Sequence, residues 1–123
     1  MTSPLSIRFD KALLERLRRR AAICDSTPSG LAQRLVDEGL RAQEHPGIVF
    51  RDGPSGRRAA LAAGPDVWEI VAAVRGSSVR DERRAVATAA QELALSPSQV
   101  SLALDYYGAF AAEIGRASCR ERV

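Results

Sequence analysis

The sequence predicts a mainly α-helical protein, in which one short strand precedes two helices and a β-hairpin precedes a second group of helices. Three patterns support this fold class. Residues 4–9 alternate between apolar and other side chains, as in a half-buried strand. Later segments place apolar residues at helical spacing, and residues 52–56 form a glycine-rich stretch between two strand-like segments.

The strand over residues 4–9 is the first predicted element. Side chains alternate along a strand, so its two faces differ. The apolar face carries Leu5, Ile7 and Phe9, and the opposite face carries Pro4, Ser6 and Arg8. A single strand cannot pair its own backbone N–H and C=O groups, and no other clear strand begins before Ile48. We therefore expect antiparallel pairing with the same strand of a second copy across a twofold axis.

Two helices are expected next, the second ending near Ala42. Asp10 is a suitable N-cap for the first helix, which extends to about Cys24. Thr27 and Pro28 place a capping hydroxyl before a proline in the first helical position, which is typical of a helix start. The residues expected in the dimer core are Leu5, Ile7, Phe9, Leu13, Leu14, Leu17, Leu31 and Leu35.

The order of strand, helix, turn and helix in residues 4–42 resembles the ribbon-helix-helix family of bacterial repressors, the CopG/MetJ/Arc group. The resemblance implies an intertwined homodimer whose two-stranded ribbon enters the major groove of double-stranded operator DNA. It also implies base reading by Ser6 and Arg8, since arginine can form two parallel hydrogen bonds with guanine. The third outward position holds Pro4, where the family usually has a polar or basic side chain, so we expect modest specificity.

The same resemblance implies contacts with DNA phosphates. The second helix begins with free N–H groups and hydroxyls, and the first helix carries a run of arginines. The residues expected at phosphate are Thr27, Ser29, Gly30, Arg18, Arg19 and Arg20. Residues 1–43 contain eight Arg and Lys against five Asp and Glu, whereas residues 44–112 contain seven against eight. The alternative for the arginine run is a helix face that is only solvated.

Residues 44–112 are expected to form a second domain, joined to the first domain, residues 1–43, by a linker at residues 45–47. Residues 48–50 and 57–62 flank the glycine-rich turn and predict a hairpin. A helix follows, with Trp68 beside its inward face. The inward residues of this helix are Val67, Ile70, Val71 and Val74.

Two further helices, over residues 80–94 and from Pro97 to at least Ala112, have the spacing of a helix-turn-helix. Ala94 stands where that motif usually has glycine. The exposed positions of the second helix are expected to be Ser98, Gln99, Ser101 and Asp105, with Tyr106 or Tyr107 further along. Because none of these residues is a cation, DNA binding by this helix is disfavoured, and a packed helical domain is the alternative.

Residues 48–61 and 86–107 resemble a small helix-turn-helix domain that accompanies ribbon-helix-helix segments in antitoxins of bacterial toxin–antitoxin pairs. This resemblance implies an antitoxin that represses its own type II operon. Its toxin, such as a PIN-like ribonuclease, would bind through residues 44–112 and beyond. Two alternatives stay open: a stand-alone ribbon-helix-helix repressor, and a dimeric interaction module that binds no DNA.

The sequence provides little for catalysis, and we expect neither an enzyme nor a cofactor or metal ion. His45 is the only histidine, neither cysteine has a recognisable base, and no Cys/His cluster has zinc-ligand spacing. Residues 53–58 lack the lysine of a nucleotide-binding loop. No apolar run approaches the roughly 20 residues of a membrane span, and the N-terminus lacks a secretion signal, so a cytoplasmic protein is expected.

Residues 113–123 break the alanine-rich pattern that precedes them. Back-translated, they resemble a common short-read sequencing adapter. We therefore expect a non-native tail and a native protein that continues beyond Ala112. The alternative is a natural helix with a basic end.

Overall fold

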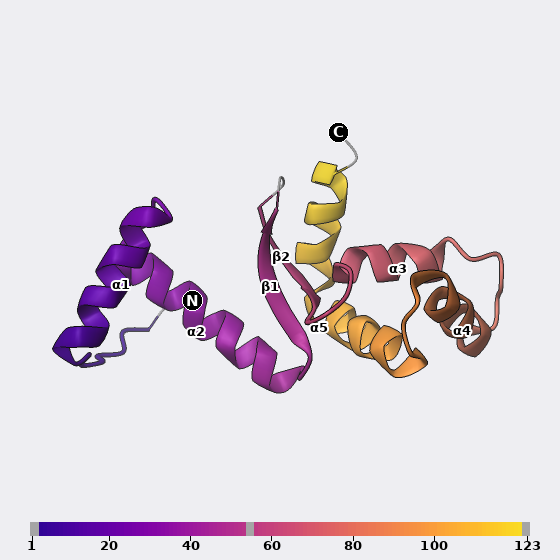
Figure 1. Ribbon diagram of the computed structural model, residues 1–123, viewed down its shortest axis with the longest axis horizontal. Helices are drawn as coiled ribbons and strands as arrows, with labels where there is room; N and C mark the ends of the chain where they lie inside the picture. The colour runs from indigo at the N-terminus through magenta and orange to yellow at the C-terminus, as the bar shows by residue number, and fades with distance from the viewer. Residues whose placement is uncertain (1–2, 54–55, 122–123) are drawn as a thin grey trace. The chain divides into compact units, whose positions relative to one another are not determined.

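The computed structural model describes residues 3–53 and 56–121, with side chains as far as Ala111. These residues form five helices and one antiparallel two-stranded hairpin (Figure 1), which confirms the predicted mainly helical fold class. None of the described helices is both long enough and apolar enough to cross a membrane. The elements are α1 (Lys11–Ile23), α2 (Pro28–Glu44), β1 (Ile48–Gly53), β2 (Gly56–Leu61), α3 (Val67–Arg75), α4 (Glu82–Leu93) and α5 (Pro97–Glu121).

The chain divides into two compact units. Unit 1 comprises Met1–Gly39 and contains α1 and most of α2, whereas unit 2 comprises Leu40–Val123 and contains the hairpin and the last three helices. The division lies within α2, and the domain boundary predicted after residue 43 lies in the last turn of the same helix.

The turn between α1 and α2 is set by short-range hydrogen bonds. Asp25 adopts a left-handed conformation with φ of 52°, and the Ser26 N–H donates to Ala21 O at 2.9 Å. Ala21, at 1% exposure, and Leu31, at 2%, are the buried side chains of the two helices.

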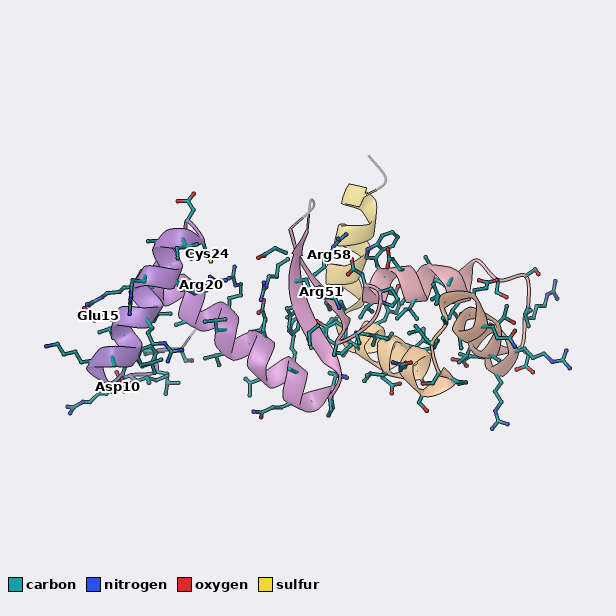
Figure 2. The ribbon with its side chains drawn as sticks, in the orientation of Figure 1. Asp10, Glu15, Arg20, Cys24, Arg51 and Arg58 are labelled. Atoms are coloured by element: carbon teal, nitrogen blue, oxygen red, sulfur yellow. The ribbon has the colours of Figure 1, made fainter. Side chains whose placement is uncertain are left out.

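The hairpin of unit 2 pairs β1 with β2 so that Ile48 lies opposite Leu61, and both side chains are buried. The central residues of its predicted turn, 54 and 55, lie outside the described residues. Arg51 donates from one guanidinium nitrogen to Leu61 O at 2.6 Å and to Gly64 O at 3.1 Å, which holds the chain as it leaves β2. Arg51 and Arg58 both extend from the hairpin in Figure 2.

The core of unit 2 lies between the hairpin and three helices. The predicted inward face of α3 is confirmed, since Val67, Ile70 and Val71 are buried and Val74, like Trp68, is half-buried against the core. The buried cluster consists of Ile48, Leu61, Val67, Ile70, Val71, Ala90, Val100, Ala103 and Tyr106. Its members come from every described element of unit 2 after α2, so the core closes within a single chain.

α5 begins as predicted, with Ser96 as its cap and Pro97 in its first position. The Gln99 N–H donates to Ser96 Oγ at 3.2 Å, and the Ser96 N–H donates to Gln99 Oε1 at 2.9 Å, which completes a capping box. The helix continues to Glu121 across a non-helical residue, Phe110, with φ of −132°. The predicted non-native tail, residues 113–123, has side chains outside the described set, and its origin stays a prediction.

The connection between α4 and α5 departs from ordinary turn chemistry at Ala94. This residue has φ of 57° and ψ of 43°, a left-handed conformation that glycine adopts without steric cost. The Leu95 N–H donates to Ala90 O at 2.8 Å and the Ala94 N–H to Gln91 O at 3.3 Å, the pattern of a Schellman motif. Ala94 therefore occupies the position of the usual helix-turn-helix glycine and adopts the left-handed conformation that glycine favours.

The substitution Ala94→Gly should stabilise unit 2 by about 0.5–1 kcal/mol, because it removes the left-handed strain from an exposed side chain. Thermal unfolding followed by fluorescence of Trp68, the single tryptophan of the chain, reports on unit 2 directly. The same change at Ala87, exposed in the interior of α4, should destabilise by about 1 kcal/mol. Destabilisation by Ala94→Gly would show that the left-handed turn is not formed in solution.

Candidate nucleic-acid interface

The segment before α1, residues 3–10, has no regular secondary structure within the single chain. Its apolar side chains turn towards the two helices and help to line a groove of about 300 Å³. The lining consists of Leu5, Ile7, Phe9, Leu14, Leu17, Pro28, Ser29 and Ala32. Pro4, Ser6 and Arg8 are exposed and take no part in this lining. The segment therefore has an apolar side and a polar side.

The backbone of this segment is free to pair. Within the described part of the chain, no backbone N–H or C=O group of residues 4–9 forms a hydrogen bond. The first bonds appear at Asp10, whose carboxylate accepts from the Leu13 N–H at 2.7 Å and so confirms the predicted cap of α1 (Figure 2). Residues 4–9 form no strand within the single chain, and their pairing with a second copy stays a prediction.

Unit 1 leaves much of its apolar surface open. The side chain of Leu5 is 81% exposed and that of Ile7 is 60% exposed. Of the eight residues predicted in the dimer core, Leu31 alone is fully buried. Half-buried members of that set are Phe9, Leu14 and Leu17, and exposed members are Leu5, Ile7, Leu13 and Leu35.

The exposed apolar side chains are confined to one part of the sequence. Among described side chains, every large apolar residue classed as exposed lies between Leu5 and Leu40. Three of them, Ile23, Val36 and Leu40, are absent from the predicted dimer core. Val36 and Leu40 lie four residues apart on one face of α2, a spacing that could have revealed them.

The start of α2 provides a small group of hydrogen-bond donors. Thr27 Oγ1 accepts from the Gly30 N–H at 3.0 Å, which confirms the predicted helix start. A Cβ atom at Gly30 would lie 3.0 Å from the same hydroxyl oxygen, so a larger residue would crowd the cap. Because the Gly30 N–H is already bonded, the donors that remain for phosphate are the Ser29 N–H and the hydroxyls of Ser29 and Thr27.

The arginine run of α1 is exposed at all three positions, Arg18, Arg19 and Arg20. No ion pair involves these side chains within the described residues. Successive residues are rotated by about 100° around the helix axis, so the three side chains span an arc of about 200°. One flat duplex surface can therefore meet at most two of them closely, and the third lies on another face.

In unit 2, the exposed face of α5 is less suited to DNA than the sequence suggested. Tyr106, expected among the exposed positions, is 1% exposed and belongs to the core. The reason is a set of contacts from α2 and the distal part of α5: Arg41 donates to Tyr106 Oη at 3.1 Å, and the Tyr106 and Phe110 ring centroids lie 4.7 Å apart. Gln99 is engaged in the capping box.

Three of the positions predicted on that face remain open to a ligand. Ser98, Ser101 and Asp105 are exposed, and Tyr107 lies half-buried beneath Arg75, whose guanidinium carbon is 4.8 Å from the ring centroid. The face thus offers two hydroxyls and one carboxylate. A carboxylate opposes approach to phosphates, and no cation among these positions offsets it.

Within the residues that the structure describes, no group of three or more His, Cys, Asp or Glu side chains is placed to hold a metal ion. Comparison of the chain with models of known protein families, with curated proteins and with solved structures found no match. The candidate interface in unit 1 is therefore supported only by the residues and contacts described above.

Proposed function

We propose that the protein is a sequence-specific DNA-binding homodimer that represses its own operon and serves as the antitoxin of a bacterial type II toxin–antitoxin pair. One observation carries the DNA-binding proposal: the apolar side chains of residues 4–9 border a groove, and Ser6 and Arg8 take no part in its lining. Their unpaired backbone supports pairing with the same segment of a second copy.

Pairing of two copies would remove the main cost of exposing this segment. Leu5 and Ile7 of each copy would be covered, and burial of a large aliphatic side chain contributes about 1.5–3 kcal/mol. The backbone groups would find partners in a two-stranded ribbon. Because side chains alternate, the outer face of that ribbon would carry two Ser6 and two Arg8 side chains.

Arg8 supplies the base-reading chemistry of this proposal. Its side chain is exposed and has no partner among the described residues. A guanidinium can donate two parallel hydrogen bonds to guanine O6 and N7, which discriminates against other bases by about 1–3 kcal/mol. The Ser6 hydroxyl can accept or donate a hydrogen bond and so has no strong preference among bases. Ser29 lies at a helix start, which suits a phosphate. Sequence discrimination would then depend chiefly on Arg8.

The antitoxin part of the proposal concerns unit 2. This unit closes its own core, and the open positions of α5 include Asp105 but no cation, a composition better suited to a protein partner than to DNA. Together with the resemblance noted in the sequence, these features favour a toxin such as a PIN-like ribonuclease as that partner. The alternatives are a stand-alone repressor and a dimeric interaction module without DNA binding.

Ile7→Lys should prevent dimerisation, because it places a charge in the apolar face of the paired segment. Sedimentation equilibrium should show a dimer for the original chain at micromolar concentration and a monomer for this variant. Circular dichroism should also show partial loss of helix, since α1 and α2 lose their apolar cover. The matched control is Arg8→Ala on the opposite side of the segment, which should remain dimeric; a stable folded monomer of the original chain would contradict the ribbon.

Arg8→Ala should weaken binding to DNA from upstream of the gene by roughly 30-fold or more per dimer, since two Arg8 side chains are lost, while leaving binding to unrelated DNA nearly unchanged. Gel-shift titrations at fixed salt measure both. Ser29→Ala should instead weaken binding to all sequences alike, because phosphate contacts carry no sequence information. If the original chain bound both DNAs equally and weakly, the interaction-module alternative would be preferred.

If the protein is an antitoxin, the adjacent open reading frame should encode a small toxin. Expression of that frame alone should arrest bacterial growth, and co-expression of the complete antitoxin gene should restore it. A control that carries Arg8→Ala should still restore growth, since neutralisation requires unit 2 and not operator binding. An adjacent frame with no effect on growth would favour the stand-alone repressor.

A further inference from the structure

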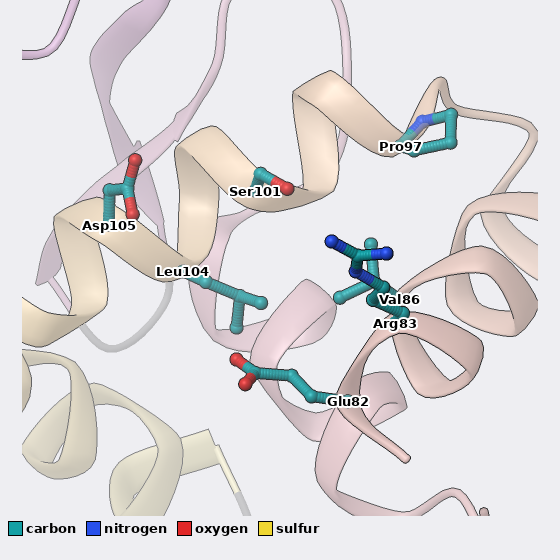
Figure 3. A pocket seen from close by; sticks show the side chains of 7 residues that line it. All are labelled: Glu82, Arg83, Val86, Pro97, Ser101, Leu104 and Asp105. Atoms are coloured by element: carbon teal, nitrogen blue, oxygen red, sulfur yellow. The ribbon is translucent and has the colours of Figure 1, made fainter.

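Unit 2 contains a cleft between α4 and α5 that none of the proposed DNA contacts uses. Its volume is about 360 Å³, within the range of sites that bind small ligands or side chains. The lining residues are Glu82, Arg83 and Val86 of α4, and Pro97, Ser101, Leu104 and Asp105 of α5 (Figure 3). The cleft thus combines an apolar part with a rim of charged and polar groups.

The apolar part is formed by Val86 and Leu104, which belong to facing helices. Both side chains are half-buried and pack on the core of unit 2 with one side. Their remaining surface borders the cleft, and Pro97 extends it at the start of α5. Such a surface can cover one apolar side chain of a partner.

Charged side chains elsewhere in unit 2 are largely engaged. Arg58 Nε lies 3.0 Å from Asp66 Oδ2, and Arg57 Nη1 lies 3.4 Å from Asp52 Oδ1. Arg41 lies over the ring of Phe110 at 4.0 Å. Arginines thus serve this unit mainly by holding its own elements together.

The charged groups at the cleft, like the neighbouring Arg84, take no part in such contacts in the described part of the chain. The side chains of Glu82, Arg83 and Asp105 are exposed and form no hydrogen bond or ion pair within the described residues. Figure 3 shows the Arg83 guanidinium between the two helices, with Ser101 on the facing helix. A guanidinium with five free N–H donors beside a hydroxyl is suited to a carboxylate.

We propose that this cleft docks a segment of a protein partner in which an apolar side chain adjoins a carboxylate. The apolar side chain rests on Val86 and Leu104, and the carboxylate accepts hydrogen bonds from Arg83 and Ser101. This inference rests on the proposed protein-binding role of unit 2, and it is independent of DNA binding by unit 1.

DNA is disfavoured as the occupant by the same residues. Glu82 and Asp105 on the rim repel a duplex, whose phosphates come in a continuous row. A peptide can place one carboxylate at Arg83 and keep uncharged or basic residues near the two rim carboxylates. A phosphate backbone offers no apolar group that could pack on Val86 and Leu104. An arginine beside apolar surface is typical of protein interfaces.

The test uses the full chain labelled with nitrogen-15 and a short acetylated peptide that contains one Leu-Asp pair among serines and glycines. Amide spectra should show saturable shifts in the first turns of α4 and around Ser101 of α5, with millimolar affinity. Peptides with Leu-Asn or Ala-Asp should bind at least about tenfold more weakly, as expected for loss of a charge-assisted bond or of the apolar anchor.

Arg83 and Arg84 provide a matched pair of variants. They are adjacent, exposed and equally charged, but only Arg83 lines the cleft. Arg83→Ala should reduce peptide affinity at least about tenfold, and Arg84→Ala should change it less than twofold. Unaltered thermal unfolding of both variants would establish that the fold is kept.

Four outcomes would overturn the proposal. They are absence of saturable shifts at the cleft, equal binding of the Leu-Asn peptide, equal losses from Arg83→Ala and Arg84→Ala, and shifts at the cleft with a short DNA duplex but not with the peptide. The last outcome would make the cleft a nucleic-acid contact. None of them would affect operator binding by Arg8, so the two proposals can fail separately.

Discussion

Unit 1 depends on a single constraint: the backbone of residues 4–9 is unpaired, and the single chain buries the apolar side chains of that segment only in part. Leu5 and Ile7 stay more than half exposed although they line a groove between α1 and α2. In the proposed dimer, the atoms that cover these side chains would be those of a second strand and its helices. Dimerisation would satisfy the backbone and the apolar surface together, and it would place Arg8 on the outside as a consequence.

Unit 2 pairs its strands and buries its apolar side chains within one chain. Its hairpin has two strands only, but Ile48 and Leu61 turn inward onto α3 and α5, and the core closes around Tyr106. Arg41 and Phe110 then cover Tyr106 from two segments far apart in the sequence. The contrast is physical: a short strand can be stable in one chain when helices bury its inward face.

Features that depend on neighbouring residues could be predicted from the sequence. The caps at Asp10, Thr27 and Ser96 are local hydrogen bonds, and they occur where the residue types indicated. Burial of Tyr106 could not be predicted, because it depends in part on a contact with Arg41, which lies 65 positions away in the sequence. The position of the turn at Ala94 follows from the helix-turn-helix spacing, but its left-handed conformation is not indicated by the residue type, since alanine favours continuation of a helix.

The candidate sites differ in the same respect. The two faces of residues 4–9 could be predicted from the alternation of side chains. The cleft between α4 and α5 could not, because it depends on the angle between the two helices, which residue spacing does not determine. Arginine illustrates the difference between the units. Arg58 and Arg41 are consumed in holding unit 2 together, whereas the arginines of α1 and Arg8 have no partner among the described residues. The Arg83 side chain of unit 2 is also free among these residues, but it stands beside the carboxylates Glu82 and Asp105. The excess of positive charge lies in residues 1–43, and in the proposed dimer DNA binding and dimerisation would use opposite sides of one short segment.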